Sequence, residues 1–158
     1  MLKFGTLEEL RNGDISRENG YVVVTMHRYP RGVRKNLMDE YQSRLAPDDQ
    51  LLKDFLVEKR RLDNHNAAFA ACHYEERFHL SPDALDELRR LSELSAKQDV
   101  YVICQCARNE RCHRELLMIL ARTHFHARTQ PRTFSYPKFE KRLLEAEEAV
   151  SAVARQKH

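Results

Sequence analysis

The stretch Asp99–Phe125, "DVYVICQCARNERCHRELLMILARTHF", contains the pattern that decides the fold. Its first residues are apolar on almost every position, which is typical of a strand covered on both faces, as in parallel sheets. A polar loop follows, and the segment that begins at Cys112 has the apolar spacing of a helix. The stretch therefore predicts a strand, a loop and a helix in direct succession.

A second stretch, Gly20–Gly32, "GYVVVTMHRYPRG", predicts another buried strand. Val22–Thr25 is a continuous β-branched run, and the cluster of Pro30 and Gly32 ends it. Ahead of this strand, Thr6–Gly13 predicts a short helix that begins with a capping box and stops at a glycine. Strands separated by helical segments favour an α/β fold with a small, mostly parallel sheet and helices packed on both of its faces.

Helices are predicted between these two strands and after the second one. One begins near Pro47 and another near Asn64, while Ser81 is an N-cap followed by proline at the first helical position. The C-terminal segment predicts an amphipathic helix whose apolar residues step by four and three. We expect that apolar stripe to dock on the sheet, with a homodimer interface as the alternative. Its members are Phe139, Leu143, Ala146, Val150 and Val153.

The length of 158 residues predicts a single domain. We divide it into an N-terminal extension (1–19), a core (20–126), a linker (127–137) and a C-terminal helix (138–158). The first residues lack the apolar core of a signal peptide, and no run approaches membrane-spanning length. Four cysteines without a secretory signal indicate a reducing cytoplasm, where thiols serve as metal ligands, nucleophiles or buried apolar side chains.

Charge is unevenly distributed, although the formal net charge is only +3. The segment 111–142 carries many more basic than acidic residues, which gives it a positive potential suited to an anionic partner, including nucleic acid. Aromatic residues such as Tyr136 are interleaved with these cations and could stack on bases. The basic residues are Arg111, Arg114, Arg122, Arg128, Arg132, Lys138, Lys141 and Arg142.

The two strand-end segments, Arg28–Gly32 and Cys104–Arg114, are the expected functional edge. In sheets of this class, ligands bind beyond the carboxyl ends of the strands. If both strands are parallel, the two segments lie side by side at one edge.

These segments also resemble a known family, domain of unknown function 488 (DUF488). The resemblance covers the chain from the first strand to the helix after the Cys-His-Arg motif, and it implies an α/β cytosolic prokaryotic protein with a site at these loops. Where that family usually has a glutamate two residues after the strand-end cysteine, this chain has Cys106. The matching positions are Cys104, Cys112, His113 and Arg114 in the later motif, Arg28, Pro30, Arg31 and Gly32 in the turn, and Ala46 and Pro47 further on.

Three kinds of chemistry fit these residues. The first is metal binding, because Cys104, Cys106, Cys112 and His113 are ligand types that zinc and iron–sulfur clusters prefer. Against it, paired ligands of structural zinc sites are usually separated by two to four residues, whereas Cys-x-Cys has one. Zinc is therefore a candidate cofactor that the sequence leaves open.

The second kind is thiol chemistry. Cys112 is expected at a helix N-terminus between Arg111 and His113, and both the helix dipole and the cations stabilise a thiolate. In this interpretation Cys112 or Cys106 is the nucleophile and His113 is the acid or base. The alternative for Cys104 is a buried strand residue without a chemical role.

The third kind is anion binding at a helix N-terminus, with Arg28, Arg31, Gly32, Arg111 and Arg114 as the binding residues. The sequence thus predicts a small enzyme acting on an anionic, phosphate- or carboxylate-bearing substrate. Two alternatives stay open: a non-catalytic module that binds a nucleotide or nucleic acid, and a zinc-stabilised structural module.

Overall fold

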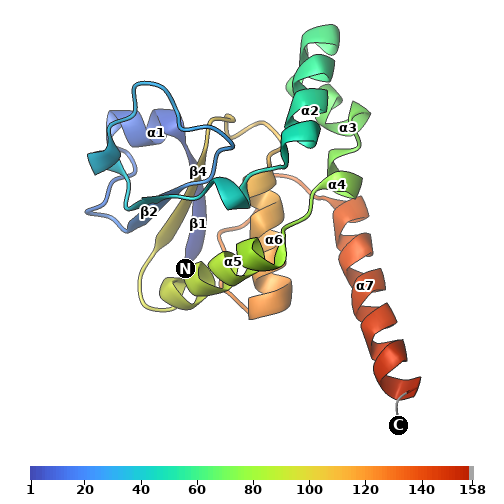
Figure 1. Ribbon diagram of the computed structural model, residues 1–158. Helices are drawn as coiled ribbons and strands as arrows, with labels where there is room; N and C mark the ends of the chain where they lie inside the picture. Colours follow the sequence, from blue (N-terminus) through green and yellow to red (C-terminus); the bar gives the residue numbers. More distant parts are fainter. Residues whose placement is uncertain (157–158) are drawn as a thin grey trace.

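The structure, a computed structural model, describes residues 1–156. Within these residues a four-stranded sheet has the order β1-β4-β2-β3, and all three strand pairs are parallel (Figure 1). This confirms the α/β fold and the parallel sheet. The strands are β1 (Leu2–Thr6), β2 (Tyr21–Val24), β3 (Glu40–Tyr41) and β4 (Val100–Cys104).

The N-terminal segment is part of the core, which corrects the expectation that residues 1–19 form an extension. β1 pairs with β4 along its whole length, with Leu2 opposite Val100 and Thr6 opposite Cys104. Leu2 and Phe4 are fully buried beneath the helices. The linker is also packed against the sheet. The backbone N–H of Leu2 donates to the carbonyl of Arg128, and the Leu2 carbonyl accepts from the N–H of Gln130, so the linker covers the outer edge of β1 there.

The two faces of the sheet bury different sets of side chains, since neighbouring strand residues point to opposite faces. Phe4, Val23 and Val102 face the larger core beneath α5 and α6, whereas Val24 and Ile103 face a smaller core closed by α1. The helices are α1 (Leu7–Asn12), α2 (Asp49–Leu62), α3 (His65–Ala71), α4 (Tyr74–Arg77), α5 (Pro82–Ser95), α6 (His113–Phe125) and α7 (Pro137–Gln156), with 3-10 turns at Lys35–Leu37 and Ser43–Leu45.

Capping side chains define where several helices begin, as the sequence predicts. Thr6 and Glu9 form the reciprocal capping box of α1, and the helix stops at Gly13, whose φ of 86° suits glycine. The Asp48 carboxylate accepts from the backbone N–H of the third residue of α2, and Ser81 does the same for α5. Each such cap contributes about 1 kcal/mol.

α7 does not dock on the sheet, which corrects the expectation that the apolar stripe of the C-terminal helix packs there. Only its first turns are covered: Phe139 is buried against Phe78, and the helix then extends away from the body (Figure 1). Leu144, Val150 and Val153 are all more than half exposed. No helix in the described part of the chain is long and apolar enough to cross a membrane.

Candidate functional site

Three cysteines converge where β4 ends and α6 begins. Cys104 is the last residue of β4, Cys106 is in the loop, and Cys112 is the N-cap residue of α6. Their sulfur atoms all lie within 4.8 Å of one another, and those of Cys104 and Cys106 are 3.8 Å apart. All three thiols are free. The cluster exists because the strand and the helix meet at the carboxyl edge of the sheet.

The His113 imidazole joins this cluster from the first turn of α6. Its Nδ1 atom lies 3.5 Å from the sulfur of Cys112 and 3.9 Å from that of Cys104. Its Nε2 atom lies 2.7 Å from the carbonyl oxygen of Thr25, at the end of the neighbouring strand β2. Because a carbonyl can only accept, Nε2 carries the proton and donates it to Thr25. The ring is therefore held with Nδ1 facing the sulfurs.

Protonation differs among these groups. Hydrogen bonds with the Cys106 and Cys112 thiols lower the pKa of Cys104 well below its ordinary value, despite burial. A hydrogen bond with Cys104 raises the pKa of Cys106, so Cys106 stays a neutral thiol. Burial disfavours the charged imidazole, but the sulfur atoms of Cys112 and Cys104 beside it outweigh this effect and raise the pKa of His113. The site thus favours a thiolate at Cys104 next to a cationic His113.

Arg114 anchors the loop between β4 and α6, which contains Cys106, through hydrogen bonds to backbone carbonyls. Its guanidinium is 1% exposed and donates to the carbonyl oxygens of Gly5 (3.2 Å), Cys106 (2.6 Å) and Ala107 (2.7 Å). It thereby ties the loop to β1. These bonds direct Arg114 into the loop, and the residue is not part of the cavity lining described below.

Other side chains also anchor the loop. His65 and Asn66 of α3 contact the backbone of Arg111, with distances of 2.8 Å each. The Tyr136 hydroxyl accepts from the backbone N–H of Cys112 (3.3 Å) and donates to the buried Glu115 carboxylate (2.7 Å). The burial of Tyr136 argues against base stacking by this ring.

A cavity of about 440 Å³ opens over the cluster. Cys104, Cys106, Cys112 and His113 form one wall, and α2 and α3 form the opposite wall. The lining carries the basic side chains of Arg28, Lys53, Lys59 and Arg111 and the acidic side chains of Asp49 and Glu110. Within residues 1–156, neither Arg28 nor Lys59 takes part in an ion pair, whereas Lys53 pairs with Asp49 at 2.7 Å.

The structure brings only some of the predicted anion-binding residues to this cavity. Arg28 and Arg111 line it, and the Arg111 guanidinium also donates to the Ser135 carbonyl and stacks on Phe134. Arg31 is exposed outside the lining, and Gly32 has a φ of 72° that serves the turn. Lys53 and Lys59 come from α2, which the sequence did not connect with the site.

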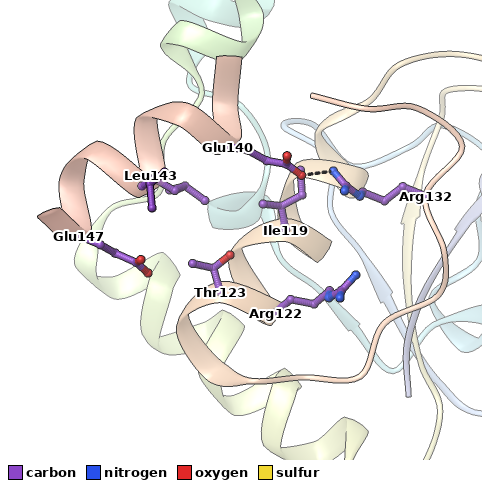
Figure 2. Close-up of a pocket in the computed structure, with 8 residues that line it drawn as sticks. Ile119, Arg122, Thr123, Arg132, Glu140, Leu143 and Glu147 are labelled. Atoms are coloured by element: carbon purple, nitrogen blue, oxygen red, sulfur yellow. Dashed lines mark ion pairs between the residues drawn. The ribbon is translucent and has the colours of Figure 1, made fainter. Parts of the chain in front are cut away.

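A second cavity of about 490 Å³ lies between α6 and α7 (Figure 2). Ile119, Arg122 and Thr123 project into it from α6, and Glu140 pairs with Arg132 across one end at 2.8 Å. It contains no cysteine or histidine. The candidate site is therefore the thiol-lined cavity at the sheet edge.

The fold and the site define an α/β protein with a thiol cluster, compatible with metal binding, at the carboxyl edge of a parallel sheet. Residues 9–124 match the family model described as the active DUF488-N3 subclade, so the chain belongs to the DUF488 family. The resemblance stated from the sequence is thereby confirmed. Searches of curated proteins and of solved structures found no match.

Proposed function

We propose that the protein is a small cytoplasmic enzyme that uses the thiol cluster to react with an anionic substrate bound in the overlying cavity. The observation that carries the proposal is the convergence of three thiols and His113 on the lining of a cavity that Arg28 and Lys59 also line, both of them without an ion pair among residues 1–156. The description of the family as an active subclade supports an enzymatic role. A reducing cytoplasm would keep the four thiols free.

In the reaction, Cys104 attacks as the thiolate, because hydrogen bonds with Cys106 and Cys112 hold its pKa well below the ordinary value. Its sulfur forms a bond to the electrophilic atom of the substrate, and the leaving group departs with its bonding electron pair. The imidazolium of His113 then donates its Nδ1 proton to that leaving group. Arg28 and Lys59 hold the anionic part of the substrate at the cavity rim.

Alkylation rates test both parts of the proposal. Iodoacetamide is neutral and iodoacetate is anionic, so the ratio of their rates measures the preference for anions. We expect rapid alkylation well below pH 8.5, the ordinary range of a free thiol, with mass spectrometry locating the label on the cluster. A cation about 6 Å from the bound reagent should raise the alkylation rate of iodoacetate relative to iodoacetamide about threefold in a water-like medium.

Matched variants make this test specific. Arg28→Gln with Lys59→Gln should lower the iodoacetate rate and leave the iodoacetamide rate unchanged, whereas Lys97→Gln, exposed at the opposite edge of the sheet, should change neither. A ratio of the two rates equal to that of a small free thiol such as glutathione would refute the anion site. Salt-sensitive protection of the thiols by single-stranded RNA would instead support the nucleic-acid module.

A further inference from the structure

We propose that Cys104, Cys106, Cys112 and His113 also form a zinc site, and that bound zinc reversibly withholds the thiols from reaction. The metal site stands on its own geometry, while its regulatory consequence rests on the proposed function.

Two interatomic distances in the cluster match those around a tetrahedral zinc ion. Zinc binds thiolate sulfur at about 2.3 Å and imidazole nitrogen at about 2.0 Å, so two sulfurs on one ion lie about 3.8 Å apart and a sulfur and a nitrogen about 3.5 Å. The observed Cys104–Cys106 distance is 3.8 Å, and the distance from Cys112 to His113 Nδ1 is 3.5 Å. The three sulfurs lie within 4.8 Å of one another and Nδ1 lies 3.9 Å from the Cys104 sulfur, so the side chains draw closer together when they share one ion.

The outer contact of His113 provides a second, independent observation. Histidines that bind zinc usually donate their other ring N–H to a carbonyl or a carboxylate, which fixes the tautomer and orients the ring. The Thr25 carbonyl, 2.7 Å from Nε2, has this role here. The lone pair of a neutral His113 therefore points toward the sulfurs from Nδ1.

The charge around the cluster suits a zinc ion bound by three thiolates. Such a site has a net charge of −1, which the N-terminal end of α6 and the buried guanidinium of Arg114 both offset. Thiolate and imidazole ligands select zinc over magnesium or calcium, which prefer oxygen.

Binding at this site is an exchange of protons for metal without redox change. Zn²⁺ forms bonds with three sulfurs and with Nδ1, and the protons held by the neutral thiols and by the imidazolium leave to solvent. The Cys104 lone pair that would attack the substrate is then engaged with the metal. A chelator that removes zinc returns the reactive thiolate.

Titration of the full chain, reduced and freed of metal, with zinc and separately with cobalt tests the site. We expect one ion per chain, thiolate-to-cobalt charge-transfer bands, and proton release on binding. Cys104→Ser and Cys112→Ser should weaken binding by more than the roughly 100-fold that loss of an outer contact can cost. Cys72→Ser is the matched control, because Cys72 is buried directly after α3, outside the cluster.

Absence of charge-transfer bands, or equal weakening by Cys72→Ser, would overturn the metal site. For regulation, one equivalent of zinc should slow iodoacetamide alkylation at least tenfold, and a chelator should restore the rate. An unchanged rate with zinc bound would overturn the regulatory role alone. The proposed function fails separately, if the metal-free protein shows no rapid alkylation or no preference for iodoacetate.

Discussion

Replacing Arg114 with methionine should destabilise the fold and release the loop over the cysteine cluster. The guanidinium is almost completely buried and supplies the hydrogen bonds of three backbone carbonyls, those of Gly5, Cys106 and Ala107. Methionine fills much of the volume of the arginine stem but donates no hydrogen bond. The substitution therefore isolates the polar role of Arg114 from its packing.

The expected loss follows from these three bonds. A buried carbonyl that loses its partner costs about 1–3 kcal/mol. We use the lower end, about 1 kcal/mol for each carbonyl, because the bonds to Cys106 and Ala107 are only partly buried and because the variant no longer has to desolvate a buried charge. The free energy of unfolding should fall by about 3 kcal/mol. With a urea m-value of about 2 kcal/mol/M, the unfolding midpoint should drop by about 1.5 M.

Urea unfolding followed by circular dichroism measures this change, and Arg111→Met is the control. Arg111 is a second arginine, in the loop itself. Its guanidinium donates to only one backbone carbonyl, that of Ser135, and lies over the Phe134 ring at a partly exposed position. Its replacement should cost about 1 kcal/mol. Faster alkylation of Cys106 in Arg114→Met would show that the loop has opened. A loss below about 1 kcal/mol with unchanged alkylation would refute this account of Arg114.

Three further predictions concern other parts of the molecule. Burial opposes ionisation of Glu40, yet its hydrogen bonds with Arg90 and neighbouring groups outweigh this effect and lower the pKa of its carboxyl. The stabilisation from the ionised carboxylate is therefore present above the unfolded value of about 4.3 and is lost as pH falls through the folded pKa. Thermal melts of Glu40→Gln should accordingly show less acid sensitivity than those of the unsubstituted chain. Tyr136→Phe should cost about 1–3 kcal/mol in urea unfolding, because it removes a donor from the buried Glu115 carboxylate, and an unchanged midpoint would contradict that role. Val150→Asp should reduce dimer formation in sedimentation velocity if the exposed stripe of α7 is a homodimer interface, whereas a monomeric unsubstituted chain at all concentrations would exclude that interface.

The candidate site was only partly predictable from the sequence. The spacing of Cys104, Cys112 and His113 placed them at a strand end and a helix start, and the structure has them there. Arg114 was expected to face a ligand, yet its guanidinium turns toward backbone carbonyls. The carbonyls of Cys106 and Ala107 belong to the preceding loop, but that of Gly5 is on β1, 109 residues away, and only the packed sheet brings it within reach. The contributions of Lys59 and His65 depend on how α2 and α3 fold over the loop, and no local pattern encodes that arrangement.

The sequence by itself determined the local elements: the buried strand before Cys104, the capped starts of α1, α2 and α5, and the helix that follows the cysteine loop. These depend on contacts within a few residues, such as the bond from Ser81 to the backbone of its own helix. Only the tertiary structure decided that Leu2–Thr6 is a strand, since its hydrogen bonds and its burial come from β4, almost a hundred residues away. It also decided that the sulfurs converge, because their distances depend on how β2, β4 and α6 pack together.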